Sequence, residues 1–250
     1  MMGRERTDAP GAVDPALFAT THWSVVLAAA DGDSPQAAAA LEQLCRAYWN
    51  PLYAYVRRRG YSPEDAKDLT QEFFFGLIRK HRFAQADRLR GRFRSFLLSS
   101  INHFLANEWD RMRAVKRGGR ISFLPLEDDT AEQLCLQESF TKSSPEQVYE
   151  KSWALALLQK VLGRLREESA AAGRSRQFDE LKPGLTGEQP LMGYADLASR
   201  LETTEAAVKM AVKRLRARYG QLLREEIAHT VADPKEAEDE LRHLCAVLSW

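Results

Sequence analysis

The sequence predicts an all-α protein made of two small helical domains joined by an acidic linker, the second a helix-turn-helix domain. Apolar residues recur at helical spacing along most of the 250 residues, whereas the alternation typical of strands is nearly absent. Prolines and glycines gather between the periodic segments. Hydrophobic residues make up 44% of the chain and charged residues 28%, which provides enough apolar material for a core in each half.

The first half contains signals for a series of helices. Ser62, Pro63 and Glu64 supply a cap, a first-turn proline and an early acid, which together are typical of a helix start. Gly60 closes the helix before them, and Gly118-Gly119 ends the domain. We predict helices from Thr21 to Ala30, from Pro35 to about Arg59, from Asp65 to Lys80, and from about Phe93 through Asn102 and onward to Lys116, the last with room for a break after Asn102.

The second half begins after an acidic, irregular stretch that we interpret as a linker. Ser144-Pro145-Glu146 repeats the start signal, and a long helix is expected to end near Gly173. A loop rich in Gly and Pro follows around residues 183–190, and one more helix is expected after Pro234. The predicted parts are an N-terminal extension, a first domain, the linker, a second domain and a C-terminal helical extension, at residues 1–34, 35–120, 121–144, 145–224 and 225–250.

Two short amphipathic segments, Tyr194–Leu201 and Glu205–Tyr219, have the pattern of a helix-turn-helix unit. Each carries an apolar stripe, and the two stripes can close on each other across the turn at residues 202–204. Such a unit offers exposed side chains at the start of its second helix to base edges in the major groove. A plain helical hairpin with a solvated basic face is the alternative. The predicted DNA-facing residues are Thr204, which is also the expected N-cap, Glu205, Lys209, Met210, Lys213 and Arg214, with Arg216 and Arg218 adding charge for phosphates.

The segment around the fourth predicted helix is strongly basic. Aromatic residues are interleaved with its charges, an arrangement that suits single-stranded or unpaired nucleic acid. The alternative is that the rings form core and the cations only solvate the helix; we expect core for Phe96 and Leu97 and leave Trp109 open. The cations are Arg88, Arg90, Arg92, Arg94, Arg111, Arg113, Lys116, Arg117 and Arg120.

The third predicted helix has an apolar face and an acidic one. Asp65, Asp68 and Glu72 follow i, i+3 and i+7 spacing and project together. No nucleophile, metal-ligand cluster or phosphate-binding glycine loop accompanies them, so a protein-binding or solvated face is a better interpretation than acid–base chemistry. The predicted apolar face holds Leu69, Phe73, Phe74, Leu77 and Ile78.

These motifs together resemble the extracytoplasmic-function (ECF) class of bacterial RNA polymerase sigma factors. The stretch from Asp65 to Phe73 is similar to the region 2 signature, and Phe93–Asn102 is similar to the helix before the loop that captures the −10 element. The pair of segments from Tyr194 to Arg216 is similar to region 4, which reads the −35 element. Thr21–Ser24 and Tyr48–Tyr53 resemble a subgroup with a longer N-terminus.

The resemblance implies partners and a role for each part of the chain. It implies that the protein binds core RNA polymerase, through the β′ clamp helices and the β flap, and directs promoter-specific initiation. Residues 102–106 would form the capture loop, and residues 107–117 would lie along promoter DNA. The implied docking residues are Asp65, Asp68, Gln71 and Glu72; the implied −10 residues are Asn102, His103, Phe104, Asn107, Trp109, Arg111, Arg113, Lys116 and Arg117; the implied −35 residues are Thr204, Glu205, Lys209, Met210, Lys213 and Arg214.

Two other functional classes remain as alternatives. A stand-alone helix-turn-helix regulator would bind duplex operators without the polymerase. A nucleic-acid enzyme would use Asp65, Asp68 and Glu72 on a metal, although we expect no enzyme activity, metal or cofactor. The C-terminal extension could pack on the second domain or receive a regulatory partner, such as an anti-sigma protein or a kinase, and we favour packing.

Cysteine usage and hydropathy indicate the compartment. Cys45, Cys135 and Cys245 are far apart and in no ligand spacing, so neither a disulfide framework nor a zinc site is indicated. The start of the chain lacks the apolar run of a signal peptide, and no stretch approaches the roughly 18 to 20 apolar residues of a membrane span. The sequence therefore predicts a cytoplasmic protein without a membrane span.

Overall fold

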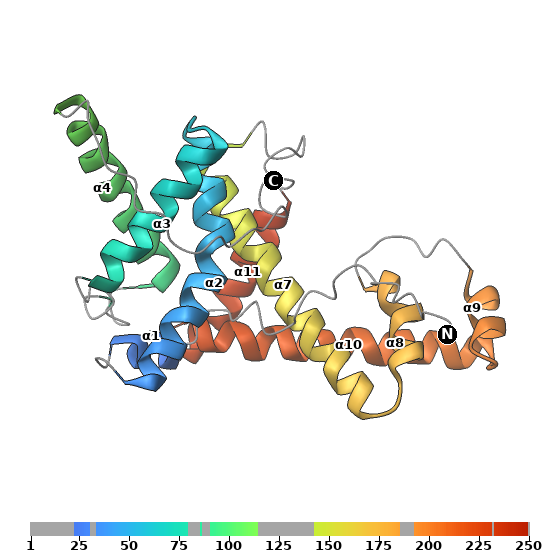
Figure 1. The fold of residues 1–250 in the computed structure, drawn as a ribbon. Coiled ribbons are helices and arrows are strands. Elements are labelled where there is room, and N and C mark those ends of the chain that lie inside the picture. Colours follow the sequence, from blue (N-terminus) through green and yellow to red (C-terminus); the bar gives the residue numbers. More distant parts are fainter. Residues whose placement is uncertain are drawn as a thin grey trace, which may run out of the picture.

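The protein is all-α in the computed structural model of the chain, which describes residues 23–30, 34–79, 86, 91–114, 143–185, 193–231 and 233–249. Within these ranges every regular element is a helix and none is a strand (Figure 1). The α-helices are α1 (Trp23–Ala30), α2 (Pro35–Arg58), α3 (Pro63–Arg79), α4 (Phe93–Ala114), α7 (Pro145–Ala171), α8 (Ser175–Leu181), α9 (Tyr194–Arg200), α10 (Glu205–Thr230) and α11 (Ala237–Leu248), with single 3₁₀ turns at Lys182–Gly184 and Pro234–Glu236.

Side-chain caps begin several helices where the sequence predicts them. The hydroxyl of Ser34 accepts a hydrogen bond from the backbone N–H of Ala37 at 3.0 Å, and a proline follows it at the start of α2. At α7, Ser144 and Gln147 form a reciprocal capping box. Thr204 caps α10 by accepting from the N–H of Ala207 at 3.2 Å. These caps satisfy N–H groups that have no partner inside the helix.

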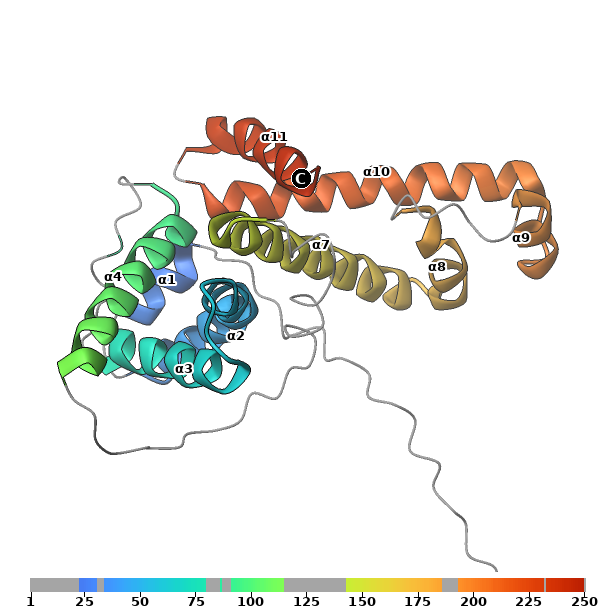
Figure 2. The same cartoon turned by 90° about the horizontal axis from the view of Figure 1, so that it is seen from above.

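The large core forms around α2, which packs against α1, α3 and α7 (Figures 1 and 2). Its rings meet edge to face or stacked: Tyr48 contacts Phe93, and Trp49 stacks on Phe74. The same buried cluster continues through α7 into α10 and α11, where Leu244 contributes. We call this cluster the large core; it joins helices from both halves of the chain.

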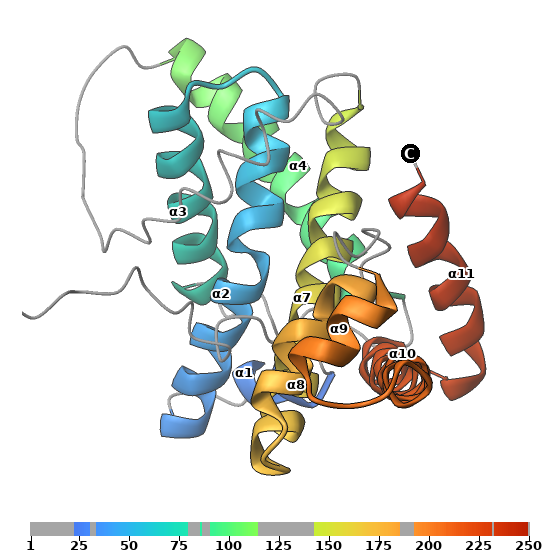
Figure 3. The same ribbon diagram turned by 90° about the vertical axis from the view of Figure 1, so that its right-hand side faces the viewer.

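The small core lies at the far end of the molecule, where the end of α7 and the start of α10 extend beyond α2 (Figures 1 and 2). Figure 3 views this end, with α8 and α9 in front and α10 seen along its axis. The small core closes α8, α9 and the first turns of α10 on one another and thereby confirms the two apolar stripes predicted for the helix-turn-helix segments. Leu181 of α8 is also buried there. The small core consists of Leu181, Leu197, Ala198, Val208, Ala211 and Val212, with Tyr194, Leu201 and Leu215 packed against it.

The structure corrects the predicted course of two helices. Residues 102–106, expected to form a loop, lie inside α4, because no proline or glycine interrupts residues 93–114 and because Ile101 and Leu105 continue one buried face. The helix expected to end at Tyr219 continues through Gly220 to Thr230, because Leu222 and Ile227 are buried in the large core. The short α8 was not predicted.

The predicted domain boundary at residue 145 separates helices that contact each other. Tyr149 of α7 meets the ring of Tyr55 of α2 edge to face. Arg58 of α2 also donates to the backbone carbonyl of Ser143 at 2.6 Å. The acidic linker lies mostly outside the described residues. The expected packing of the C-terminal extension is confirmed, since Leu244 and Val247 of α11 are buried against the rest of the chain.

Candidate functional site

The acidic row of α3 lies on its solvent side. Asp65, Asp68 and Glu72 are exposed, and Gln71 is half-buried beside them. Asp65 also belongs to the helix start, since its backbone N–H donates to the Ser62 hydroxyl at 3.1 Å and its carboxylate accepts from that hydroxyl at 2.9 Å. The opposite face of α3 buries Ala66, Thr70, Phe73, Phe74 and Leu77. The four predicted docking residues thus share one accessible surface.

Two apolar residues extend this acidic row toward the C-terminal end of α3. The side chain of Phe75 is 52% exposed and that of Ile78 is 38% exposed, so the prediction that placed Ile78 on the buried face is wrong. The guanidinium carbon of Arg79 lies 5.8 Å from the centre of the Phe75 ring. The signal was available in the sequence, because Phe75 follows Asp68 by seven residues, two helical turns, and so shares its side of the helix.

The predicted −10 residues of α4 point in different directions. Asn102 faces inward, where its side-chain oxygen accepts hydrogen bonds from the hydroxyl of Tyr55 and from Arg59 at 3.3 Å. Phe104 is half-buried with its ring centre 5.7 Å from that of Phe73. His103 and Asn107 are exposed. The side chains of Trp109, Arg111 and Arg113, and the whole of Lys116 and Arg117, lie outside the described residues.

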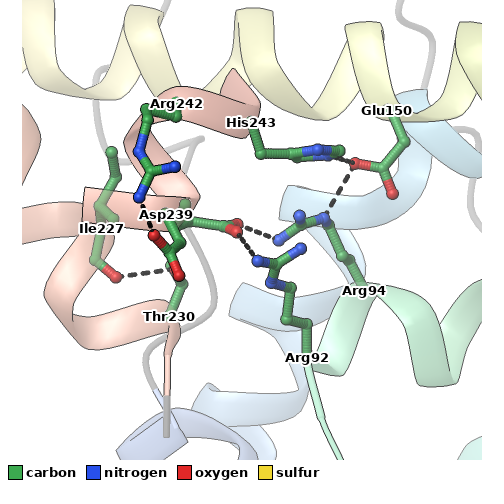
Figure 4. Close-up of polar contacts among 9 residues, drawn as sticks. Arg92, Arg94, Glu150, Ile227, Thr230, Asp239, Arg242 and His243 are labelled. Atoms are coloured by element: carbon green, nitrogen blue, oxygen red, sulfur yellow. Dashed lines mark hydrogen bonds and ion pairs between the residues drawn. The ribbon is translucent and has the colours of Figure 1, made fainter. Parts of the chain in front are cut away.

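Two arginines of the predicted basic segment point into the molecule instead of toward solvent (Figure 4). Arg94 is 2% exposed and forms ion pairs with Glu150 at 3.0 Å and with the fully buried Glu240. Arg92 lies 2.7 Å from the other carboxylate oxygen of Glu240. His243 contacts Glu150 at 3.1 Å. Arg94 of α4 and Arg92, which directly precedes α4, therefore join this part of the chain to α7 and α11. Their charge belongs neither to a nucleic-acid surface nor to a purely solvated face, the two interpretations considered for this segment.

Arg94 also contacts α7 through its backbone and through an aromatic ring. The hydroxyl of Tyr149 donates to the carbonyl of Arg94 at 2.9 Å, and the guanidinium carbon lies 4.1 Å from the centre of the Trp153 ring. Burial acts to lower the pKa of Arg94, but the carboxylates of Glu150 and Glu240 outweigh it and raise that pKa. Arg94 therefore stays charged, and its charge is compensated inside the protein.

The start of α10 presents the predicted DNA-facing residues to solvent. Thr204 uses its hydroxyl as the N-cap, and the residues after it follow the exposed side of the helix. Glu205 and Lys209 form an ion pair at 2.6 Å, and the Glu205 carboxylate raises the pKa of Lys209. The exposed set is Thr204, Glu205, Lys209, Met210, Lys213 and Arg214.

Two further arginines of α10 stabilise the fold around the helix-turn-helix. Arg216 donates twice to the carbonyl of Gly184, at 3.0 and 2.7 Å. Arg218 pairs with Glu168 of α7 at 2.6 Å. Their charges, which sequence reasoning assigned to phosphates, are thus directed at groups of the protein itself.

Comparison with known proteins identifies the part of the chain that contains α3 and α4. Residues 44–114 match the family model of sigma-70 region 2. These residues are thus similar to sigma-70 region 2. The match includes most of α2, the acidic row of α3 and all of α4. It supports a sigma factor role in transcription initiation, with core RNA polymerase and promoter DNA as partners. Neither the curated proteins nor the solved structures compared with the chain give a match.

None of the helices in the described ranges combines the length and the apolar character needed to cross a membrane. Among the residues that the structure describes, no three His, Cys, Asp or Glu side chains are grouped so that they could hold a metal ion.

Proposed function

We propose that the chain is a sigma factor of the ECF class that binds core RNA polymerase and directs it to specific promoters. The observation that carries this proposal is the region 2 match at residues 44–114 together with the exposed acidic row that it contains. The resemblance of the later helices to region 4 supports the class. In this proposal residues 35–120 act as region 2, residues 145–224 as region 4, and residues 121–144 connect them.

The acidic row of α3 is the proposed docking surface for the polymerase. The β′ clamp helices would be contacted by Asp65, Asp68, Gln71 and Glu72. A second contact, with the β flap, is assigned to the region 4-like part of the chain. The accessibility of the four docking residues supports this role, and the exposed ring of Phe75 adds apolar surface at the end of the row. Interfaces commonly combine apolar surface with polar residues around it.

Recognition of the −10 element is proposed for the outward side of α4. His103 and Asn107 are accessible, whereas Asn102 and Phe104 contact α2 and α3 and would support the helix from within. Trp109, Arg111, Arg113, Lys116 and Arg117 would continue the contact further along the chain. Capture of an extruded base at this site would cost a few kcal/mol, which the polymerase contacts must offset.

Recognition of the −35 element is proposed for the start of α10. Its exposed side chains have the placement of a recognition helix, and the Thr204 cap sets where that helix begins. Lys213 and Arg214 would contact phosphates, while Lys209 and Met210 lie closer to the cap, where base edges are read.

The experiment that tests this proposal is co-elution of the purified protein with bacterial core RNA polymerase. We expect stoichiometric binding that Asp68→Arg abolishes, because the substitution puts a cation in the acidic row. Glu42→Arg is the matched control: it makes the same charge change at a side chain that is 62% exposed on α2. A folded protein that fails to bind core polymerase at moderate salt, yet binds duplex DNA tightly, would instead be a stand-alone regulator.

A further inference from the structure

The helix-turn-helix carries one large apolar side chain on its solvent side. Among the residues that the structure describes, the large hydrophobic residues that are exposed are Leu27, Phe75, Ile78 and Met210. Met210 lies in the second turn of α10 and is 51% exposed. A single exposed apolar side chain is common on proteins, so the neighbours of Met210 decide whether it has a role.

Met210 lies near the centre of the side of α10 that faces away from the small core. Ala206, Met210 and Lys213 follow i, i+4 and i+7 spacing, and all three are exposed. The buried residues Val208 and Val212 occupy the opposite side. When a helix-turn-helix binds duplex DNA, the start of its second helix lies in the major groove and meets the base edges there. Met210 is therefore on the side that would meet them.

Polar side chains near Met210 are already engaged within the protein. The hydroxyl of Thr204 accepts the capping hydrogen bond at the start of α10. The ammonium group of Lys209 lies 2.6 Å from the Glu205 carboxylate and 5.7 Å from the centre of the Tyr194 ring. These contacts draw Lys209 toward α9, which packs beside the start of α10 (Figure 1). Reading of bases by these polar groups competes with contacts that they already make, whereas an apolar contact by Met210 requires no such exchange.

The major groove offers one apolar group to a side chain in this position, the 5-methyl group of thymine. The other groups that distinguish the base pairs there are hydrogen-bond donors and acceptors. Contact between Met210 and a thymine methyl removes apolar surface from water on both sides, which is favourable. Opposite a different base, Met210 covers polar edges that lose water without gaining a hydrogen bond. A methionine is flexible enough to adjust its length to the groove.

The charges around Met210 favour nucleic acid over protein as its partner. Lys213 and Arg214 are exposed and lie one turn further along the same side of α10. Lysine is depleted in protein–protein interfaces, whereas lysine and arginine neutralise phosphates when a helix enters the groove. An apolar residue with cations on either side fits a major groove, where base methyl groups line the floor and phosphates line the edges.

We propose that Met210 is a specificity-determining residue that selects thymine in the −35 element through the 5-methyl group of that base. This inference rests on the proposed function, because it takes the start of α10 as the reader of the −35 duplex. The thymine lies on either strand and so specifies an A·T pair. Lys213 and Arg214 supply affinity that is independent of sequence, and Met210 supplies part of the sequence choice.

The proposal is tested on holoenzyme assembled from the full-length chain and bacterial core RNA polymerase. A preferred sequence is first selected from a duplex pool that is randomised across the −35 segment. Each thymine of that sequence is then replaced by deoxyuridine, which lacks only the methyl group. At one position we expect deoxyuridine to weaken binding about four-fold, the factor that corresponds to exposing one buried methyl group. In Met210→Ala the difference between thymine and deoxyuridine at that position should vanish.

Three further variants separate the methyl contact from other effects. Met210→Leu keeps an apolar side chain of similar volume and should retain the discrimination between thymine and deoxyuridine. Lys213→Ala should weaken binding to both duplexes by the same factor, because it removes a phosphate contact. Leu27→Ala removes a similarly exposed apolar side chain from α1 and should leave binding to both duplexes unchanged.

Each contrary result has a distinct meaning. If a −35 sequence is selected but no position responds to deoxyuridine, or if the response persists in Met210→Ala, the role of Met210 is overturned and the sigma function stands. Weaker binding of core polymerase by Met210→Ala, with thymine discrimination unchanged, overturns the inference and assigns Met210 to a protein contact. A folded chain that fails to bind core polymerase overturns the proposed function and this inference together.

Discussion

The large core and the small core differ in how they are built. The large core combines aromatic residues such as Tyr48, Tyr55 and Tyr149 with aliphatic residues from helices far apart in sequence. The small core has six buried residues from α8, α9 and the start of α10, all of them aliphatic. Polar contacts lie near its surface, among them the ion pair of Arg200 with Glu180 at 3.1 Å and the Thr204 cap.

This difference indicates that the two cores have different structural roles. Stability scales with the apolar surface removed from water, so the large core supplies most of it. The small core has only to hold the start of α10, the proposed recognition helix, in one orientation. Helix α10 belongs to both, with Val208 in the small core and Leu222 in the large one, and so transmits stability to the helix-turn-helix.

The largest effect is expected from matched leucine truncations in the two cores. Leu157→Ala removes a fully buried side chain from the large core, and we expect a loss of about 4 kcal/mol in the free energy of unfolding. Leu197→Ala, in the small core at 5% exposure, should cost about 2 kcal/mol, since fewer atoms surround it. Urea unfolding followed by circular dichroism measures both. Equal losses would show that the two cores are equally well packed.

A smaller effect is expected at the glycine that divides α10 between the two cores. Gly220 is helical, and a Cβ added there would meet only the end of the Arg224 side chain, at 3.5 Å. Gly220→Ala should therefore raise the free energy of unfolding by up to about 1 kcal/mol. Gly60→Ala is the opposing control, because its φ of 97° should make alanine cost about 1 kcal/mol or more. Destabilisation by Gly220→Ala would mean that α10 needs flexibility at this point.

The smallest effect is expected on DNA binding by the exposed basic residues of α10 beside the small core. Lys213→Ala removes one exposed cation from the start of α10 and should weaken binding to promoter duplex about three-fold. The slope of log K against log salt should fall by about 0.9 for one lost phosphate contact. Lys235→Ala, exposed near the start of α11, is the control and should change neither quantity. A slope unaffected by Lys213→Ala would place the DNA surface elsewhere.

Local signals made most of the helices predictable. Ser62 with Pro63, Ser144 with Pro145, and Thr204 each begin a helix where expected, because a cap acts through neighbouring residues alone. The acidic row of α3 and the exposed residues of α10 were predictable for the same reason, since helical spacing determines which side chains share a face. Phe75 could have been added to the row by that rule.

Contacts between distant segments were not predictable from local pattern. The local sequence around an arginine near the start of α4 does not indicate whether that arginine faces DNA or a distant carboxylate. In the structure, Arg94 faces Glu240, which is 146 residues away. Asn102 likewise belongs to a hydrogen-bonded contact with Tyr55 that no spacing rule indicates. The segment predicted to end at Tyr219 continues through Gly220, because the burial of Leu222 and Ile227 outweighs the small cost of a glycine inside a helix.

The sequence by itself determined the helical class, the helix starts and the chemical character of each exposed face, because these depend on side chains within about two turns of one another. Only the tertiary structure decided which cations are internal, how far α10 extends, and that α11 supplies a counterion to α4. Those features depend on which surfaces meet and lose their water, and the pairing of surfaces is a property of the whole folded chain.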